Sequence, residues 1–414
     1  MFWRCFLVGG IFFQLLIKST PSSALWKVEL SDVKAVCNDD SRAVFYIKRG
    51  SPKHWIFFFE SGGLCSSKAE CNERYKDKNS TVLMSSNSLP ASVIGRDILS
   101  SSISENPTFY KYTHVLVPYC SSDLWLGDST GLNRTFQFVD DSSANNFIFR
   151  GKTIFQGIFK QLSPIKNAEH IVVSGSSAGG IGVMNHAEWL SNLFHGSKVK
   201  LRFIIDSAWF INFQDGFTSR VNMEFAQLTG TSSSACADSS YGYPCCLSSA
   251  CLITRGYFPS NASVAFVFSL YDIYMFADVL KRLESEGKTA EDHDADFLSV
   301  VSMYGGAMNG SIELPHNTGG HSSFFVPACF QHTYFSTSSL WDTDGVLHPL
   351  VEVTRGSGKF RWELAANFIP SKMDIGGANS AVMSGAQSSI VQEKSLADPG
   401  EGLGPPLFLG QTEA

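Results

Sequence analysis

The chain has 414 residues, of which 44% are hydrophobic and 17% charged, and its formal net charge is −6 at pH 7. This composition is typical of a globular protein with a large core, and it excludes a mostly disordered or fibrous chain. A nucleic-acid-binding surface needs a basic excess that this chain lacks, so we expect no nucleic-acid partner. The length allows two or three small domains, or one large α/β domain with insertions.

The amino terminus has the features of a secretory signal peptide. Arg4 precedes a mostly apolar stretch from Cys5 to Ile17, and small residues end the segment at Ala24. A single-pass anchor is disfavoured because the apolar stretch is shorter than the ~20 residues that span a bilayer. We predict a signal peptide over residues 1–24, a secreted extracellular protein, and no transmembrane segment in the mature chain.

Five apolar runs predict buried parallel strands, and three stretches with helical spacing predict helices between them. The strands are expected over Trp55–Phe59, His114–Pro118, His170–Ser174, Leu201–Ile205 and Val264–Leu270, and the helices over Lys152–Leu162, Gly182–Phe194 and Ile273–Leu283. This alternation is typical of an α/β domain with a parallel sheet and helices on both faces. We expect the domain over residues 25–355.

Residues 207–261 form a segment that is too long for a turn between two predicted strands. It is rich in Ser, Gly and aromatic residues and contains Cys236, Cys245, Cys246 and Cys251. We interpret it as a disulfide-stapled cap insertion, in which four cysteines allow three pairings. Residues 356–414 lose hydrophobic pattern and predict a disordered tail.

The mature chain keeps nine cysteines, and in a secreted protein most of them should form disulfides. Because nine is odd, at least one lacks an intramolecular partner. Four glycosylation sequons, at Asn79, Asn133, Asn261 and Asn309, support secretion and predict surface loops. The acidic run at 291–296 is more typical of a solvated loop than of a metal site. We expect no metal and no cofactor.

The strongest chemical signal is the G-x-S-x-G motif at residues 175–179. An apolar strand precedes it and a helical stretch follows it, which is the context of a nucleophile elbow. Ser177 is therefore the candidate nucleophile, whereas Ser176 lies in the wrong register. The alternative is a glycine-rich turn in which Ser177 only caps the helix.

An oxyanion hole, an acid and a base must accompany a serine nucleophile. Gly62 and Gly63 follow an early strand, as in the loop that supplies oxyanion-binding N–H groups, and the N–H of Ala178 would join them. An ordinary loop is equally compatible with this feature. Asp272 is the preferred acid because it follows a later strand than its rival, Asp206. Spacing does not choose the base among five histidines, which are His293, His316, His321, His332 and His348.

Five blocks of the sequence resemble, in order, those of the pectin acetylesterase–Notum family of secreted serine esterases. They are Glu60 to Cys65 with Cys71, Val117 to Asp123, Gly175 to Gly180, Asp206 to Phe210, and Pro327 to His332. The resemblance spans residues 37–341 and is closer to the animal Notum branch. It implies an α/β-hydrolase-like fold, a triad of Ser177, Asp272 and His332, and disulfides joining Cys37 to Cys120 and Cys65 to Cys71.

The sequence also departs from this family. Ser61 replaces a usual glycine, and Gly63-Leu64 replaces an aromatic pair. Leu252 and Ile253 stand where family members line an acyl pocket with phenylalanines, while Phe210 matches a pocket aromatic. We expect these three residues to bind the acyl group. The family partner of Cys329 has no counterpart, which fits the odd cysteine count.

Three functions remain open. The resemblance favours a carboxylesterase that removes a palmitoleoyl group from a serine of Wnt proteins, because a lipid chain suits an apolar pocket. A carbohydrate O-acetylesterase, acting on an acylated glycan, is the alternative. A non-catalytic lipid or glycan binder is the third, and the complete Ser177, Asp272 and His332 set argues against it.

Overall fold

The computed structural model describes residues 23–129, 147–213, 220–231, 233–237, 244–275, 285–287, 295–316, 321–327 and 332–335. The predicted signal peptide, the tail and Cys329 lie outside these residues, apart from Ser23 and Ala24 at the end of the signal segment. Within the described part of the chain, no helix combines the length and hydrophobicity needed to cross a bilayer.

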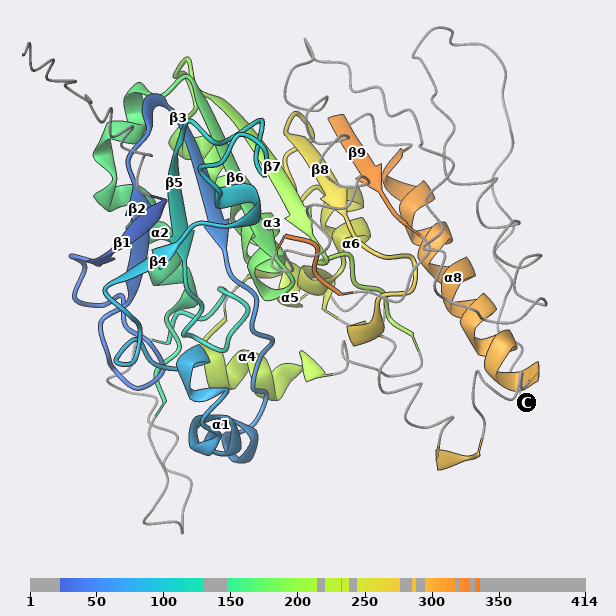
Figure 1. Cartoon of the computed structure of the whole chain (residues 1–414). Helices are drawn as coiled ribbons and strands as arrows, with labels where there is room; N and C mark the ends of the chain where they lie inside the picture. Colours follow the sequence, from blue (N-terminus) through green and yellow to red (C-terminus); the bar gives the residue numbers. More distant parts are fainter. Residues whose placement is uncertain are drawn as a thin grey trace, which may run out of the picture.

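A nine-stranded, mostly parallel sheet forms the centre of the molecule (Figure 1). Its spatial order is β4-β1-β2-β5-β3-β6-β7-β8-β9. The six strands from β5 to β9 in this order are parallel, whereas β4, β1 and β2 pair antiparallel at one edge. The bounds are β1 Ala24–Glu29, β2 Val44–Lys48, β3 Ser51–Phe59, β4 Ser92–Ile94, β5 Tyr112–Val117, β6 His170–Ser176, β7 Lys200–Asp206, β8 Ser263–Val267 and β9 His321–Phe325.

Helices and shorter helical turns connect these strands. The α-helices are α1 Lys68–Lys76, α2 Gly151–Gln161, α3 Ala178–Leu193, α4 Met223–Thr229, α5 Ser234–Ala237, α6 Ser249–Thr254 and α8 Ala295–His316. The 3-10 turns are η1 Thr81–Leu83, η2 Asp97–Leu99, η3 Ser163–Asn167 and η5 Cys245–Leu247. Helices α1 and α4 lie near each other beyond the carboxyl ends of the strands (Figure 1).

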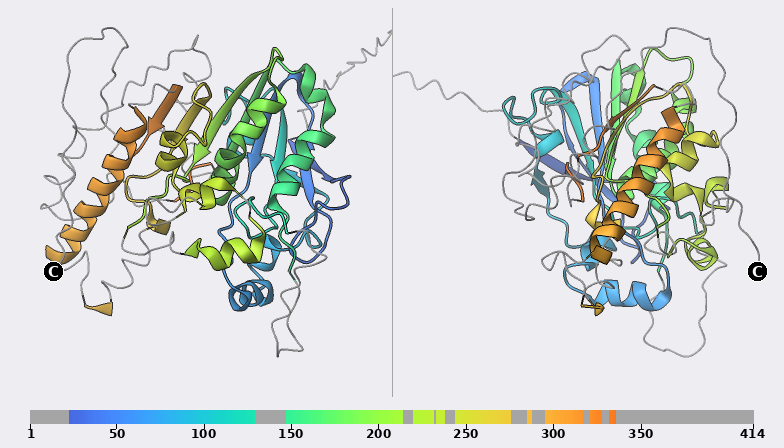
Figure 2. Two further views of the ribbon diagram at one scale, coloured as in Figure 1. Left: turned by 180° about the vertical axis from the view of Figure 1, so that it is seen from behind. Right: turned by 90° about the vertical axis from the view of Figure 1, so that its right-hand side faces the viewer.

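The strand sequences bury both faces of the sheet because alternate residues point to opposite sides. On β3, Trp55, Phe57 and Phe59 belong to the main core with α2, α3, α6 and part of α8. Figure 2 shows α2 and α3 in front of the strands when the molecule is seen from behind. The intervening Ile56 and Phe58 point to a second cluster, which η2 and residues 334–335 help to cover. A strand buried on both faces explains the continuous apolar runs of the sequence.

Four disulfides cross-link the described chain. Cys37–Cys120 and Cys65–Cys71 are the two pairs implied by the family resemblance. Inside the 207–261 segment the pairs are Cys236–Cys246 and Cys245–Cys251, which selects one of the three possible pairings. In this segment α6 packs into the main core, whereas Leu228 of α4 packs against the Cys65–Cys71 cluster near α1. A cap role for the segment stays a prediction.

The observed elements agree with most of the expected ones and add others. All five predicted strands are present, although β8 ends at Val267 rather than Leu270. The antiparallel strands β1, β2 and β4 were not predicted; β1 and β4 are only partly buried, whereas β2 is buried and as long as β8. The expectation of a surface loop at Asn309 is wrong, since this residue lies within α8. Asn79 and Asn261 are exposed.

Phe59 provides a test of the core packing. Its ring stacks on Phe155 at 4.2 Å and meets Trp125 edge-on at 5.2 Å. Phe59→Ala should lower the free energy of unfolding by about 3–5 kcal/mol, through lost burial and a cavity. Trp26→Ala is the control, because 59% of Trp26 is exposed, and it should change stability by about 0.5 kcal/mol or less. Urea unfolding measures both, and equal losses would contradict this description of the core.

Candidate active site

The register of the parallel strands brings distant loops to one edge of the sheet. Phe59 pairs with Gly175, Ser176 with Asp206, Asp206 with Val267, and Val267 with Phe325. The chain leaves each of these strands on the same edge, just after these residues. Ligand sites of parallel α/β sheets lie at this carboxyl edge. The residues that follow the strands are therefore neighbours in space although they are far apart in sequence.

Ser177 occupies a sharp turn between β6 and α3. Its backbone has φ of 51° and ψ of −116°, a conformation that side-chain-bearing residues rarely adopt. The Ser177 N–H donates to the carbonyl of Asp206 at 2.8 Å, and the Ser177 carbonyl accepts from the N–H of Ile181 at 3.0 Å. These two bonds stabilise the strained turn. Ser177 is 5% exposed.

The glycines of the motif are required by close backbone contacts. A Cβ atom on Gly179 would lie 2.0 Å from the carbonyl oxygen of Phe59, and one on Gly175 would lie 2.4 Å from the carbonyl carbon of Gly179. Both distances are far below van der Waals contact. The absence of side chains thus lets the start of α3 pack directly against the end of β3. This brings the backbone of Phe59 and Glu60, just before the Gly62–Gly63 loop, against the first turn of α3.

Two side chains hold the Gly62–Gly63 loop from its outer side. The Arg74 guanidinium on α1 donates to the carbonyl of Gly62, and the Tyr119 hydroxyl donates to the carbonyl of Gly63 at 2.9 Å. In a trans peptide the N–H points opposite to the carbonyl. The contact with Arg74 therefore turns the N–H of Gly63 away from Arg74. Burial lowers the pKa of Arg74, and the phenol groups of Tyr119 and Tyr274 counteract this shift.

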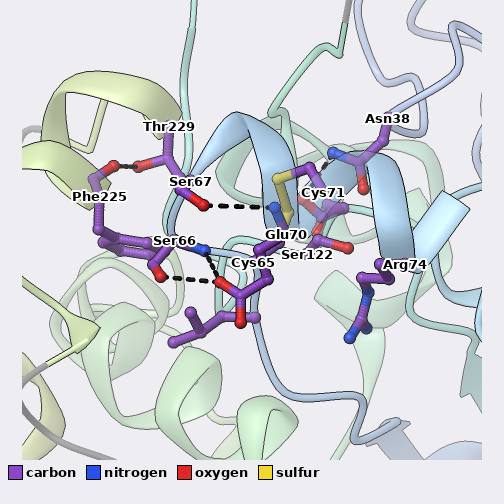
Figure 3. The surroundings of a disulfide bond; sticks show 12 residues. Asn38, Cys65, Ser66, Ser67, Glu70, Cys71, Arg74, Ser122, Phe225 and Thr229 are labelled. Atoms are coloured by element: carbon purple, nitrogen blue, oxygen red, sulfur yellow. Dashed lines mark hydrogen bonds between the residues drawn. A yellow bond between two sulfur atoms is a disulfide. The ribbon is translucent and has the colours of Figure 1, made fainter. Parts of the chain in front are cut away.

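Helix α1, which carries Arg74, is itself fixed by a local network (Figure 3). Cys65 and Cys71 form a disulfide beside the helix start. The Ser67 hydroxyl caps the helix by accepting from the N–H of Glu70 at 3.3 Å, as N-cap serines commonly do. Glu70 accepts from the N–H and hydroxyl of Ser66 and from Arg220. The position of Arg74 is therefore set by covalent and polar constraints.

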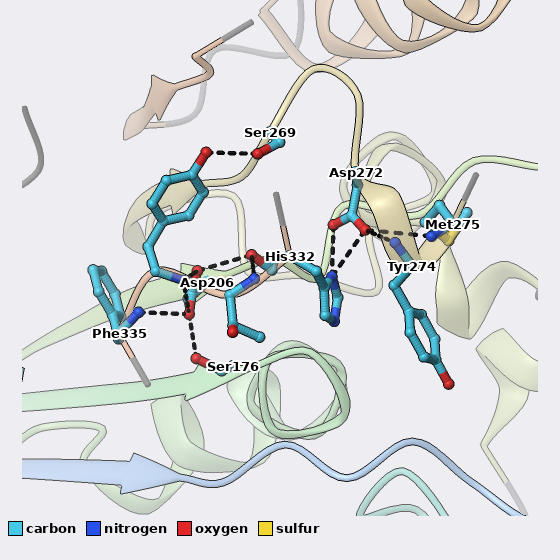
Figure 4. Close-up of polar contacts among 11 residues, drawn as sticks. Ser176, Asp206, Ser269, Asp272, Tyr274, Met275, His332 and Phe335 are labelled. Carbon is cyan, nitrogen blue, oxygen red and sulfur yellow. Dashed lines mark hydrogen bonds and ion pairs between the residues drawn. The ribbon is translucent and has the colours of Figure 1, made fainter. Parts of the chain in front are cut away.

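Asp272 and His332 are hydrogen-bonded partners at the same edge (Figure 4). His332 Nδ1 lies 2.8 and 2.9 Å from the two oxygens of Asp272. Because a carboxylate accepts, Nδ1 carries the proton and Nε2 keeps its lone pair. Asp272 Oδ1 also accepts from the N–H groups of Tyr274 and Met275, at 3.0 and 3.3 Å. The Asp272 side chain is only 4% exposed, so these donors replace its water.

Tyr274 extends from the histidine to the glycine loop. Its ring stacks on that of His332 with centroids 4.9 Å apart and planes 22° apart. A Cβ atom built on Gly63 would lie 3.1 Å from the Tyr274 hydroxyl. The side chain thus bridges the space between the base and the loop, and 37% of it is exposed. Tyr274 is therefore a neighbour of both predicted parts of the site, the base and the oxyanion loop.

The three predicted acyl-binding residues lie in or against the main core. Phe210 and Leu252 are each 1% exposed, and Ile253 packs partly buried against the same cluster. Phe210 follows the end of β7, and the other two belong to α6. Their environment is apolar, as the sequence implies. Their role in binding an acyl group stays a prediction.

The structure brings together most of the residues that the sequence singles out. Of the five candidate histidines, His332 is the one bound to Asp272. His321 is the first residue of β9 and so lies at the amino ends of the parallel strands, opposite to the candidate site. His293 and His348 lie outside the described residues. His316 ends α8, and its side chain lies outside the description too. Asp206, the rival acid, binds other groups, which include Ser176 and the N–H groups of Tyr334 and Phe335.

Sequence reasoning missed the supporting residues of the site. No role was predicted for Arg74 and Tyr119, which bind the Gly62–Gly63 loop. Asp206 was considered only as the alternative acid to Asp272. Tyr119 and Asp206 stand inside blocks that carry the family resemblance. Their position directly after strand ends was the available signal. Within the described residues, no group of three or more His, Cys, Asp or Glu side chains is placed to hold a metal ion.

Gly179 provides a test of the tight turn. Gly179→Ala should abolish folding or lower the free energy of unfolding by about 4 kcal/mol or more, because its Cβ would collide with the Phe59 backbone. Gly196→Ala is the control. Gly196 has φ of 74° but no atom within 4 Å of an added Cβ, so only the ~1–2 kcal/mol of the left-handed conformation applies. Thermal unfolding compares them, and a stable Gly179→Ala protein would contradict the packing.

The chain is similar to known proteins in sequence. The pectinacetylesterase family model matches residues 23–352. Human palmitoleoyl-protein carboxylesterase NOTUM is 35% identical over 191 residues, which cover 44% of this chain and 36% of the relative. The Drosophila melanogaster NOTUM is 27% identical over 326 residues, which cover 75% of this chain and 45% of the relative. The chain thus spans about a third to a half of the curated relatives that it matches.

A solved structure shares the fold. The Wnt deacylase Notum from Drosophila superposes with a TM-score of 0.62 at 25% identity, over 76% of this chain and 87% of that one. The nine-stranded sheet is accordingly α/β-hydrolase-like. Because the family model matches about four-fifths of the sequence, the chain belongs to the pectinacetylesterase family.

Proposed function

We propose that this protein is a serine carboxylesterase. The observation that carries the proposal is the hydrogen-bonded Asp272–His332 pair at the edge where Ser177 sits on a strained turn. A buried carboxylate that orients a histidine, together with a serine raised above a sheet, is the arrangement of acyl-transfer hydrolases. The family description and the carboxylesterase names of the relatives support the same reaction class.

In the proposed mechanism Ser177 Oγ attacks the ester carbonyl carbon while His332 Nε2 takes its proton. The negative charge that forms on the carbonyl oxygen is stabilised by the N–H groups of Gly62, Gly63 and Ala178. Ala178 is the first residue of α3, so the positive end of the helix dipole adds to this stabilisation. Asp272 keeps the proton on Nδ1 and stabilises the imidazolium.

The intermediate then collapses and the alcohol leaves with the proton from His332 Nε2. The remaining acyl-serine is attacked by water, which gives its proton to the same nitrogen. Collapse of the second intermediate releases the carboxylic acid and returns the proton to Ser177. Each step uses one base that is alternately protonated and deprotonated.

Hydrolysis of p-nitrophenyl esters tests this assignment. Ser177→Ala and His332→Ala should each lower kcat by ~10³-fold or more, since members of a triad act as a unit. Ser176→Ala is the matched control, because Ser176 adjoins the nucleophile but points to Asp206. It should retain a far larger share of the activity than Ser177→Ala. Full activity in folded Ser177→Ala protein would exclude the proposal.

For the natural substrate, we propose the palmitoleoyl ester of a Wnt serine. The names of the relatives, palmitoleoyl-protein carboxylesterase and Wnt deacylase, support this choice. The apolar surroundings of Phe210, Leu252 and Ile253 are compatible with a lipid chain. We also propose that the protein is secreted, because four disulfides form readily only in an oxidising compartment.

One observation favours the second candidate, an O-acetylesterase acting on a glycan. Tyr274 bridges His332 and Gly63, and a narrow entrance suits a short acyl group better than a long one. The two candidates therefore predict different dependence of kcat/KM on acyl length. A long-chain esterase requires that Tyr274 lie beside the acyl path rather than across it.

Substitution of Tyr274 separates these candidates. If Tyr274 limits the acyl group, Tyr274→Ala should raise the ratio of decanoyl to acetyl kcat/KM by ~10-fold or more, as removal of a pocket contact of ~1–3 kcal/mol predicts. Tyr274→Phe is the control, because it keeps the ring on His332 and loses only the hydroxyl. Its ratio should match the wild type. A wild-type optimum at long chains, unchanged in Tyr274→Ala, would exclude the O-acetylesterase.

A further inference from the structure

A buried carboxylate outside the proposed triad connects its two halves. Asp206 ends β7 and is completely buried. Both of its oxygens accept hydrogen bonds, and the donors lie 30 residues before Asp206 and 128–129 residues after it in the chain. On one side the Ser176 hydroxyl, adjacent to Ser177, donates to Oδ2. On the other side the N–H groups of Tyr334 and Phe335 donate at 3.0–3.1 Å.

The neighbouring backbone strengthens this connection. Besides its side-chain bonds, Asp206 accepts the N–H of Ser177 on its own carbonyl at 2.8 Å. Ser207 donates its hydroxyl to Asp206 Oδ1 at 2.9 Å and accepts the N–H of Thr333 at 2.9 Å. Three consecutive residues after His332 are thus bound to Asp206 or Ser207. Figure 4 shows Asp206 between Ser176 and the 332–335 segment.

The polar contacts of the Asp206 carboxylate are mainly those of this network. Its hydrogen-bond donors among the described residues are two hydroxyls and two backbone N–H groups, all of which a carboxylate can accept. Burial raises the pKa of Asp206, and the bonds from Ser176 and from Phe335 and Tyr334 counteract that shift. A buried carboxylate has a large desolvation cost, which the network offsets only while all its donors are in place.

From this geometry we infer that Asp206 is a positioning residue that fixes the segment 332–335 relative to the turn at Ser177. This inference rests on the proposed esterase function. His332 is oriented by Asp272, but that contact leaves its distance from Ser177 undetermined. Asp206 supplies the missing constraint, because it binds the residue before the nucleophile and the residues after the base. A displacement of about 1 Å between reacting groups can lower a rate by ~10²-fold.

The chain offers a matched control in Asp123. Asp123 is also completely buried, and it accepts the Ser121 hydroxyl at 2.6 Å and the N–H groups of Trp125 and Gly151 at 3.0 and 2.8 Å. Its side chain joins the turn after β5 to the start of α2. Asp123→Asn should therefore destabilise the protein to a similar extent as Asp206→Asn, without moving His332.

The experiment compares Asp206→Asn, Asp123→Asn and the wild type by ester hydrolysis and by hydrogen–deuterium exchange of the peptide that contains residues 332–335. We expect Asp206→Asn to lower kcat by ~10²-fold with KM changed by ~3-fold or less, and to increase exchange at Tyr334 and Phe335. Asp123→Asn should leave the exchange of the 332–335 peptide within about threefold of the wild type, because Asp123 binds no residue of that segment. Ser176→Ala added to Asp206→Asn should lower kcat no further, because both changes break one connection.

Each result has a distinct meaning. Equal increases in exchange of the 332–335 peptide in Asp206→Asn and Asp123→Asn, or an unchanged exchange or an unchanged kcat in Asp206→Asn, would overturn the positioning role. Wild-type protein without Ser177-dependent hydrolysis would instead overturn the proposed function. In that case the exchange data still report whether Asp206 restrains the segment, so the two failures are distinguishable.

Discussion

The contact of the Ser177 turn with its neighbouring strands is the constraint on which the site depends. The turn adopts a strained backbone that is stabilised by the bond from its N–H to the Asp206 carbonyl. Its glycines let α3 approach the end of β3 more closely than any side chain would permit. Consequently the proposed nucleophile and the start of α3 lie directly against the end of β3, from which the glycine loop continues. Such preorganisation is what transition-state stabilisation requires.

The supporting residues form two groups. One group binds the glycine loop, and the other binds the segment that follows His332. Arg74 and Tyr119 bind the carbonyls of Gly62 and Gly63 and so fix the direction of the N–H groups of Gly63 and Leu64, which share those peptide planes. Asp206 and Ser207 bind the segment that follows His332. Tyr274 lies between both sides and contacts the base and the loop. The proposed role of Tyr274 thus concerns the size of the acyl group, whereas the buried contacts position the proposed catalytic groups.

Much of the sheet and the Ser177 turn was predictable because local sequence patterns indicate them. Continuous apolar runs identify strands that are buried on both faces, and the motif at 175–179 identifies the turn by the steric need for glycine. The pairing of His332 with Asp272 was not derivable from spacing, since 60 residues separate them. It came from the family resemblance, and the structure places the two side chains in contact.

The position of Asp206 at a strand end was visible in the sequence, but its connection to the 332–335 segment was not. Its donors from the 332–335 segment lie 128 and 129 residues away, so only the sheet register reveals the connection. The same reason explains the four cysteines of residues 236–251. Their pairing follows from how α5, η5 and α6 pack, and the sequence alone left three possibilities. Long-range contacts of this kind are properties of the tertiary structure.

The central claim is that Ser177 is a nucleophile activated by His332. Its most direct measurement is the site and rate of covalent labelling by a fluorophosphonate, read by mass spectrometry of peptides from the purified protein. We expect one label, on Ser177, and a large decrease in labelling rate in folded His332→Ala protein. Labelling at Ser176 instead, or an unchanged rate in His332→Ala, would contradict it.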